Sequence, residues 1–303
     1  MAMERVAAHI PVLRDAVVER LAPADRRILL DCTVGLGGHA DALLGAAGPG
    51  TQLIGIDLDE SNLRRAKERL SRFAPRVRLF QANFVSAREV LDQADVEEAD
   101  AVLADLGSAS SQLDDPQRGF GFAAEGPLDM RMDRRAKTTA ADLVNRLREA
   151  ELADLIYRHG EERYSRRIAA AIVHARREDP IRTTGALAGI VEGAIPASAR
   201  RARRGVHPAT RTFQALRIAV NEELGSLDGL LELLPSILSV GGRAAIISFH
   251  SLEDRRVKRA FASWGAQGSA RILTKKPITA EAHELRRNPR SRSAKLRAIE
   301  RTA

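Results

Sequence analysis

The sequence is poor in several features that define whole classes of protein. Cys32 is the one cysteine in 303 residues, so no internal disulfide can form and a reducing compartment is expected. No apolar run reaches the roughly 18 residues that a membrane-spanning helix requires, and residues 1–13 lack the apolar core of a signal peptide. No Cys/His cluster has the spacing of metal ligands. We therefore expect a cytoplasmic protein with no membrane segment and no metal.

Aromatic residues are also scarce, at 4% of the chain, which argues against broad stacking platforms for single-stranded nucleic acid. The net charge of +8 is unevenly distributed. Residues 271–303 hold ten Lys/Arg and three Asp/Glu. A second basic cluster has no acid between its first and last members, which are Arg200, Arg201, Arg203, Arg204, Arg211 and Arg217. Either cluster alone is compatible with a solvated surface, but the two together favour an anionic polymer as partner.

The first third of the chain alternates strand-like and helix-like patterns. Short apolar runs predict strands, and charged amphipathic stretches predict the helices between them. The predicted strands are 27–31, 52–57, 76–81 and 101–105, and the predicted helices are 39–47 and 60–71. Strands and helices in alternation are typical of right-handed βαβ units, which build a parallel sheet covered on both faces.

The pattern changes in the middle of the chain, where residues 113–211 contain no convincing strand. Helical spacing recurs there at 140–148, 149–157, 162–177 and 184–194, and later at 212–224 and 227–240. Gly241 and Gly242 predict a turn before a last apolar strand at 243–249, and the final thirty residues are expected to be partly extended. We predict an α/β fold with a doubly wound, mostly parallel sheet in residues 1–112 and 213–303, interrupted by an inserted all-helical domain in residues 113–212.

A glycine-rich turn lies between the first predicted strand and the first predicted helix. Gly35, Gly37 and Gly38 allow the backbone to approach a ligand closely, and the helix start adds free N–H donors. Asp57 ends the next strand, twenty residues after Gly37, where a carboxylate can accept hydrogen bonds from ribose hydroxyls. This combination serves NAD and S-adenosylmethionine alike.

Two features favour S-adenosylmethionine over a dinucleotide. The turn has the spacing G-x-G-G and lacks the third glycine of G-x-G-x-x-G. It also opens with Asp31, whose carboxylate would repel a pyrophosphate and attract the ammonium of a methionine moiety, unless this residue only shapes the turn. Phe84 follows the third strand, where it would either meet the adenine or belong to the core.

Asp105 ends the fourth predicted strand, at the sheet edge where open α/β proteins bind ligands. Methyl transfer to an exocyclic amine needs a group that accepts the amine N–H bonds, because the nitrogen lone pair is delocalised into the ring. Asp105 suits this role and could equally contact the methionine end of the cofactor or cap a turn.

With these residues in place, the chain closely resembles the bacterial family of 16S ribosomal RNA cytosine-N4 methyltransferases, the RsmH or MraW family. Three blocks are particular to that family: Gly126–Asp133, His207–Gln214 and Ser248–Asp254. Further matching blocks run almost end to end: His9–Leu13, Asp31–His39, Gly55–Asp59, Asp105–Gly107, Ser110, Gln112–Asp115, Arg118–Phe122, Gly160–Arg163 and Val220–Glu222. Ser111 stands where the family commonly has Pro, although Gln112 keeps its register.

The resemblance implies a Rossmann-like class I methyltransferase with a helical insertion for substrate recognition. It also implies transfer of a methyl group from S-adenosylmethionine to the N4 amine of a cytidine in the decoding (P-site) region of 16S ribosomal RNA, within the 30S subunit. The cofactor contacts carried over from the family are Gly37, Gly38, His39, Asp57, Phe84, Asp105 and Gln112, and Asp105 is the expected catalytic residue. Such a target base would be single-stranded or splayed out.

Several residues keep two interpretations each. His250 and Ser251 follow the last apolar strand and either line the base pocket or belong to the core, as Asp31 either meets the cofactor or shapes its turn. The residues expected to bind RNA, some of which could instead brace the fold, are Arg201, Arg203, Arg204, His207 and Arg211. The charges of Asp129, Arg131 and Asp133 either orient the nucleotide or form internal salt bridges, and for each single charge the salt bridge is favoured.

Three other functions are open to a chain of this kind. A DNA amine methyltransferase would usually carry an Asp/Asn-Pro-Pro-aromatic motif, whereas Asp105-Leu106-Gly107-Ser108 lacks both prolines. An NAD-dependent oxidoreductase is disfavoured by Asp31 and by the spacing of the turn. A non-catalytic ribosome-assembly factor would bind RNA through its basic clusters and tolerate the loss of Asp105. Either a monomer or a homodimer is compatible with the sequence.

Overall fold

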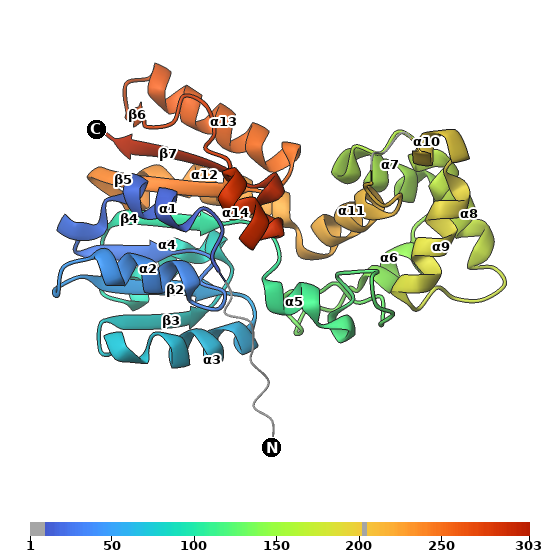
Figure 1. The fold of residues 1–303 in the computed structure, drawn as a ribbon, viewed down its shortest axis with the longest axis horizontal. Coiled ribbons are helices and arrows are strands. Elements are labelled where there is room, and N and C mark those ends of the chain that lie inside the picture. Colours follow the sequence, from blue (N-terminus) through green and yellow to red (C-terminus); the bar gives the residue numbers. More distant parts are fainter. Residues whose placement is uncertain (1–9, 202–204) are drawn as a thin grey trace. The chain divides into compact units, whose positions relative to one another are not determined.

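Seven strands form one sheet in the order β3-β2-β1-β4-β5-β7-β6 in a computed structural model of the chain, which describes residues 10–201 and 205–303 (Figure 1). The strands are β1 Ile28–Asp31, β2 Gln52–Asp57, β3 Val77–Gln81, β4 Ala99–Asp105, β5 Leu238–Ser248, β6 Ala270–Ile272 and β7 Lys295–Arg301. β1 to β5 run parallel, while β7 is antiparallel to both β5 and β6. The predicted mostly parallel α/β sheet is thereby confirmed.

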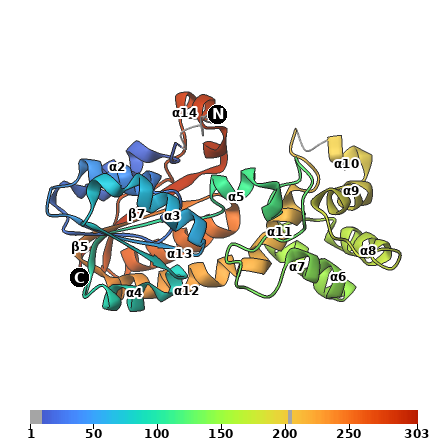
Figure 2. The ribbon, with the colours of Figure 1, turned by 90° about the horizontal axis from the view of Figure 1, so that it is seen from below.

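Helices cover both faces of this sheet, as Figure 2 shows for α2 and α3 on one side and α4 and α12 on the other. The α-helices that accompany the sheet are α1 Arg14–Leu21, α2 Gly38–Ala46, α3 Glu60–Arg69, α4 Ala87–Gln93, α12 Glu223–Ile237, α13 Ser251–Ala266 and α14 Ala282–Arg287. Short 3-10 turns occur at η1 Pro23–Asp25, η2 Ser71–Phe73, η3 Phe84–Ser86 and η5 Pro289–Ser293.

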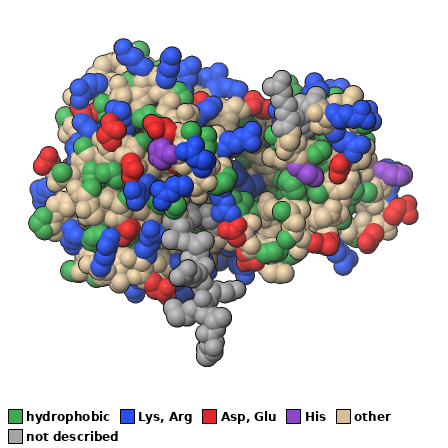
Figure 3. Space-filling view, viewed as in Figure 1, with side chains coloured by type: hydrophobic (Ala, Val, Ile, Leu, Met, Phe, Trp, Pro, Cys, Tyr) green, Lys and Arg blue, Asp and Glu red, His purple; other side chains and the backbone are tan. Residues whose placement is uncertain are grey.

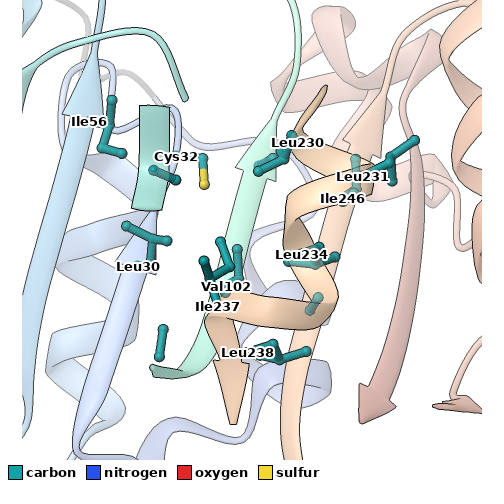
Figure 4. Packing of buried hydrophobic residues seen from close by; sticks show 14 of the residues in the cluster. Leu30, Cys32, Ile56, Val102, Leu230, Leu231, Leu234, Ile237, Leu238 and Ile246 are labelled. Atoms are coloured by element: carbon teal, nitrogen blue, oxygen red, sulfur yellow. The ribbon is translucent and has the colours of Figure 1, made fainter. Parts of the chain in front are cut away.

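The two-sided burial follows from the period of a strand, because successive side chains point to opposite faces. Leu30 and Ile246 belong to one buried cluster with residues of α4, α12 and α13, whereas their neighbours Leu29 and Ile247 belong to a second cluster with residues of α1, α2 and α3. Figure 4 shows the first cluster, in which Leu230 and Leu234 of α12 lie over the strands. Continuous apolar strands are therefore the expected signature of this sheet.

The C-terminal part differs from the prediction of a polar, partly extended tail. β7 lies between β5 and β6 within the sheet, and Leu296 and Ala298 are fully buried. Its charged residues are compensated by distant partners, as when Arg297 Nε donates to Asp254 Oδ1 at 2.7 Å. β5 also begins at Leu238, so Gly241 and Gly242 lie inside the strand, near an irregularity in its pairing with β4, and not in a turn before it.

The chain divides into two compact units, one of residues 1–107 and 224–303 and the other of residues 108–223. The second unit contains α5 Ser110–Asp114, α6 Ala140–Arg146, α7 Glu149–Gly160, α8 Ser165–Ala175, α9 Thr184–Ala194, α10 Ala197–Arg201, α11 Thr210–Asn221 and the 3-10 turn η4 Pro116–Arg118. The sequence predicts these boundaries at residues 112 and 213. The structure adds residues 110–112 of α5 and residues 213–221 of α11 to the helical unit, because α11 packs closely on α7: a Cβ on Gly160 would lie 2.5 Å from the carbonyl oxygen of Arg211.

A separate core of apolar side chains holds the helical unit together. Ile156 of α7, Ile168 of α8 and Leu187 of α9 are fully buried in it, together with Leu216 of α11. None of the helices in the described residues has the length and apolar character needed to span a bilayer.

Candidate active site at the carboxyl edge of the sheet

The turn between β1 and α2 is shaped by glycine and by a carboxylate from the neighbouring strand. Gly37 has φ +76°, and a Cβ there would lie 3.3 Å from the Cα of Ala66 in α3. Gly35 also has a positive φ, and its N–H donates to Asp57 Oδ2 at 2.9 Å. Glycine is favoured at such positions because it alone adopts them without strain. The backbone of this turn can therefore approach a ligand that binds at the carboxyl ends of the strands.

Asp57 is more heavily engaged than the sequence suggested. Its Oδ1 accepts from the N–H of Asp59 at 2.7 Å and from Asn62 Nδ2 at 3.3 Å, while Oδ2 accepts from Gly35. Burial raises the pKa of Asp57 to about 6, against the lowering effect of these hydrogen bonds. A carboxylate oxygen can accept a second hydrogen bond, so contact with ribose hydroxyls stays open while Asp57 also fixes the turn.

Asp31 and Asp105 end adjacent parallel strands, and Thr33 connects them. Asp31 Oδ1 accepts from the N–H of Thr33 at 3.1 Å, and Thr33 Oγ1 accepts from the N–H of Asp105 at 2.7 Å. Sequence reasoning missed Thr33, since a threonine in a turn carries no distinctive signal until the two strands are paired. Thr33 thereby fixes the side chain of Asp31 and the backbone of Asp105 at the edge where an open α/β sheet binds its ligands.

His39 faces these acids from the first turn of α2. It is 7% exposed, and its Nε2 lies 3.4 Å from Asp105 Oδ2, although neither ring nitrogen makes a hydrogen bond within the described residues. The pKa of Asp31 rises to about 7: burial is the largest cause, His39 opposes it, and the charges of Asp105 and Asp57 add to it. The charges of three carboxylates and one imidazole therefore act on one another at this edge of the sheet.

Two carboxylate oxygens of this group lack partners. Asp31 Oδ2 and Asp105 Oδ1 are buried without a hydrogen bond from any described residue. Leaving such atoms unpaired costs about 1–3 kcal/mol each, so a ligand that brings N–H donors or positive charge is favoured there. S-adenosylmethionine has an ammonium and a sulfonium and fits this donor set, whereas a pyrophosphate does not. Burial also raises the pKa of the nearby Cys32 thiol, which keeps it protonated.

Phe84 lies in η3, directly after β3, and is partly buried against the apolar cluster that contains Leu30. The preceding residue, Asn83, donates from Nδ2 to Ser226 Oγ at 3.0 Å and caps η3. The core interpretation of Phe84 therefore has support, and its contact with adenine stays a prediction.

His250 forms the N-cap of α13. Its Nδ1 accepts from the N–H of Glu253 at 3.4 Å, and Glu253 Oε2 accepts from the N–H of Phe249 at 2.8 Å. His250 Nε2 lies 3.1 Å from Glu253 Oε1 but makes no hydrogen bond within the described residues. This nearly buried histidine therefore has a structural role on one side of its ring, and Ser251 beside it is exposed. A role for either residue in the base pocket remains a prediction.

Gln112 lies in α5 of the helical unit, where it is 3% exposed and its Oε1 accepts from the N–H of Ala109 at 3.0 Å. Its contact with the cofactor stays a prediction.

The residues predicted to bind RNA have different local settings. Arg201 is exposed at the end of α10, while Arg203 and Arg204 lie outside the described residues. The ring of His207 lies 4.5 Å from that of Phe122, and Arg211 Nη1 donates to the carbonyl of Glu161 at 2.8 Å. His207 and Arg211 thus brace the helical unit, and their contact with RNA is untested.

The charges of residues 129–135 form internal pairs, as predicted for Asp129, Arg131 and Asp133. Arg131 donates from Nε to Asp129 Oδ1 and from Nη2 to Oδ2, both at 2.7 Å. Asp133 binds Arg135 in the same two-pronged way, at 2.9 Å for the shortest contact. These side chains stabilise a loop.

A doubly wound sheet in this strand order, a glycine turn after β1 and acids at the ends of β1, β2 and β4 define a Rossmann-like methyltransferase that uses S-adenosylmethionine. The chain belongs to the MraW methylase family, whose model matches residues 6–302. The predictions of this family, this fold class and this cofactor are confirmed.

Relatives of high similarity cover almost the whole chain. A protein of Symbiobacterium thermophilum is 49% identical over 306 residues, which cover 96% of each chain, and is named ribosomal RNA small subunit methyltransferase H. A protein of Nitratidesulfovibrio vulgaris with the same name is 50% identical over 309 residues, covering 97% of this chain and 95% of its own. Among solved structures, an rRNA methylase from Streptococcus thermophilus matches over all of both chains, with 14% identity and a TM-score of 0.44.

Proposed function

We propose that this chain transfers a methyl group from S-adenosylmethionine to the exocyclic N4 amine of a cytidine in the decoding (P-site) region of 16S ribosomal RNA. The names of the relatives support a small-subunit ribosomal RNA as substrate. The observation that carries the proposal is the buried Asp105 Oδ1, which has no hydrogen-bond partner among the described residues and lies at the ligand-binding edge of the sheet.

The chemistry follows from the electronic structure of the base. The N4 lone pair of cytosine is delocalised into the ring, so the amine must be held and polarised before it can act as a nucleophile. Asp105 accepts a hydrogen bond from one N–H of that amine and draws electron density toward the nitrogen. When bound, S-adenosylmethionine would supply an electrophilic methyl group on its sulfonium, and S-adenosylhomocysteine would leave with the electron pair of the broken S–C bond.

The fate of the proton is the second task of the site. When the new N–C bond forms, N4 becomes positively charged and must lose one proton. The Asp105 carboxylate takes that proton, and the imidazole of His39 lies beside it, with Nε2 3.4 Å from Asp105 Oδ2. Thr33 fixes the backbone of Asp105 through the 2.7 Å hydrogen bond at its N–H. Positioning of this kind raises the rate of methyl transfer, because holding the reacting groups in near-attack geometry lowers the activation barrier.

The remaining cofactor contacts that we propose follow the family pattern. Asp31 Oδ2 receives the ammonium of the methionine part, and Asp57 receives the ribose hydroxyls. Gly37 and Gly38 let the backbone of the turn approach the cofactor, and Phe84 contacts the adenine. Gln112 of the helical unit completes the set, and that unit recognises the RNA through Arg201, Arg203, Arg204, His207 and Arg211.

The test is transfer of tritiated methyl from S-adenosylmethionine to 30S subunits from a strain that lacks the activity, followed by digestion and separation of the nucleosides. Label in N4-methylcytidine is the expected result. Asp228→Asn, an exposed acid of α12 paired with Arg256, serves as a matched control for Asp105→Asn. The control should methylate at the wild-type rate.

Each other outcome points to a different function. Label in another nucleoside would reject the N4 amine, and label on DNA with none on 30S subunits would favour a DNA amine methyltransferase. RNA binding with full methyl transfer by Asp105→Asn would reject the role of this carboxylate. RNA binding with no methyl transfer to any RNA or DNA would favour a non-catalytic assembly factor.

A further inference from the structure

We propose that residues 275–292, which connect β6 to β7 and which we call the C-terminal excursion, form a second RNA-phosphate-binding surface that lies on the sheet-containing unit beside the cofactor edge. The inference rests on the proposed function and deepens it, because it adds a contact outside the inserted helices. The inference has two bases. The cations of the flanking strands are paired with carboxylates whereas most of those in the excursion are not, and the register of the sheet places the excursion near the cofactor edge.

The cations of the flanking strands are neutralised. Arg297 Nε lies 2.7 Å from Asp254, Arg301 Nη1 lies 2.9 Å from Glu98, and Arg271 Nη2 lies 2.7 Å from Glu300. Hydrogen bonds from Arg243 and Arg271 outweigh partial burial and lower the pKa of Glu300, which keeps it ionised as their partner. The cations of β6 and β7 are thus used for folding.

The cations of the excursion are arranged differently. The segment contains six Lys/Arg and two Asp/Glu. Five of these cations are exposed and form no ion pair with any carboxylate in the described residues: Lys275, Lys276, Arg286, Arg287 and Arg292. The acids are occupied, since Glu284 Oε1 accepts from the N–H of Leu13 at 2.7 Å and Glu281 Oε2 lies 3.4 Å from His283 Nδ1. The surface around α14 accordingly carries several Lys and Arg side chains in Figure 3.

The register of the sheet places this charge near the active site. β7 is antiparallel to β5 and starts at Lys295, which pairs with Ser248 at the carboxyl end of β5. The excursion ends just before Lys295, so it lies at the edge where the parallel strands finish and where Asp105 is found on β4, the neighbour of β5. Figure 1 shows α14 beside this end of the sheet.

Hydrogen bonds tie the excursion to the N-terminal segment next to the glycine turn. Asn288 Nδ2 donates to the carbonyl of Ile10 at 3.0 Å, and fully buried Ser291 donates to the carbonyl of Asn288 at 2.7 Å. Pro11 of that segment lies over Gly38 at the start of α2, where an added Cβ would be 3.3 Å from the Pro11 side chain. The cations are therefore held on a fixed frame that reaches the cofactor turn, as a surface that positions a backbone requires.

The chemistry of the surface favours RNA phosphates over a lipid bilayer. Unpaired arginines bind phosphate oxygens and release condensed counterions. A helix that binds a membrane needs a wide apolar face, whereas Leu285 is the one large exposed apolar side chain of the segment.

The test compares two triple variants with the same change of charge. Arg286→Gln/Arg287→Gln/Arg292→Gln removes three cations of the excursion. The control, Arg65→Gln/Lys67→Gln/Arg69→Gln, removes three exposed cations from α3 in the same unit. Binding of a fluorescent single-stranded 16S-derived RNA by the full chain would be measured from about 50 to 200 mM salt, and S-adenosylmethionine affinity would check that both variants are folded.

We expect the excursion variant to lose about tenfold or more in RNA affinity, and its slope of log affinity against log salt to fall by about 2, as for three lost phosphate contacts on a single strand. The control should keep the wild-type slope. Equal losses in both variants, or an unchanged slope in the first, would overturn the surface, as would a wild-type chain that binds no RNA. The assay needs no methyl transfer, so retained RNA binding with the expected slope change and no N4-methylcytidine would reject the proposed function alone.

Discussion

Two acidic regions of the molecule use their carboxylates in opposite ways. In residues 129–135 of the helical unit, Asp129 and Asp133 each bind an arginine two residues further along the chain. At the carboxyl edge of the sheet, Asp31 Oδ2 and Asp105 Oδ1 are buried and have no partner in the described residues. Both regions contain acids in blocks that match the family, yet only the sheet edge leaves carboxylate oxygens available to a ligand.

The pKa values express the same contrast. Partial burial would raise the pKa of Asp129, but the hydrogen bonds and charge of Arg131 outweigh it and lower that pKa. Burial raises the pKa of Asp31 to about 7, against the opposing effects of His39 and of the hydrogen bond from Thr33. An acid with a depressed pKa stabilises the fold in its ionised form, whereas an acid with a raised pKa weakens the fold when it ionises. Such destabilised acids are typical of ligand-binding sites.

The largest effect is expected from Asp105→Asn, which keeps the shape of the side chain and removes its capacity to take a proton. Methyl transfer to 30S subunits should fall by about a thousandfold or more, as for loss of a general base. The midpoint temperature of thermal unfolding without ligand should stay unchanged or rise slightly, because the substitution removes a partly buried charge. Single-turnover rates and calorimetry would be compared with those of Asp228→Asn. A rate within threefold of wild type would contradict the assignment.

A smaller effect, with a defined pH dependence, is expected from Asp31→Asn. Asp31 in the free protein is protonated below pH 7, and a bound ammonium favours the ionised form. Affinity for S-adenosylmethionine should therefore rise as pH approaches about 7 and level off above it, with proton release on binding below pH 7. The Asn variant should bind at least about tenfold more weakly at pH 8 and lose this rise.

Calorimetry in buffers of different ionisation enthalpy would measure the released proton. The pKa of Asp57 near 6 should leave a weaker residual dependence in the Asp31→Asn variant. An unaltered pH profile in that variant would assign the effect to Asp57 or to another group. Asp31→Asn should also stabilise the free protein increasingly between about pH 4 and pH 7, where folding of the wild type opposes ionisation.

The smallest effect is expected from Asp129→Asn, which breaks the two-pronged pair with Arg131. The free energy of unfolding at pH 7 should fall by about 1–2 kcal/mol, as for a partly buried charge-assisted pair. Because the pKa of Asp129 is depressed, the loss should be present above about pH 4 and vanish as wild-type Asp129 is protonated at lower pH. Affinity for S-adenosylmethionine should not change. A reduced affinity with unaltered stability would place Asp129 in the binding machinery.

The parts of the fold that were predictable are those with a local signal. The apolar runs of β1 and β2 and the glycine turn between β1 and α2 are readable because their residues depend on near neighbours. Asp57 and Asp105 could be placed at strand ends for the same reason. The pairing of Asp129 with Arg131 is likewise a contact across two residues.

The rest depends on contacts between distant residues. The sequence of β7 predicts a polar tail because Lys295, Arg297 and Arg301 interrupt its apolar positions, and their partners Asp254 and Glu98 are far away in sequence. Thr33 gains its role only when β4 pairs with β1. Asp57 accepts hydrogen bonds from three N–H groups because of the path that the backbone takes through the turn. The preferences of single residues do not specify that path.

The place of β7 in the sheet has a consequence for how the protein is made. Its residues 295–301 come after β5, α13, β6 and α14 in the sequence, yet they form an inner strand between β5 and β6. Chains fold from the N-terminus as they emerge from the ribosome, so β1 to β4 are available long before the sheet can be completed. Until β7 is in place, β5 lacks its antiparallel neighbour and β6 lacks its partner strand. A folding intermediate of this methyltransferase without β7 therefore exposes a strand edge that other chains can pair with.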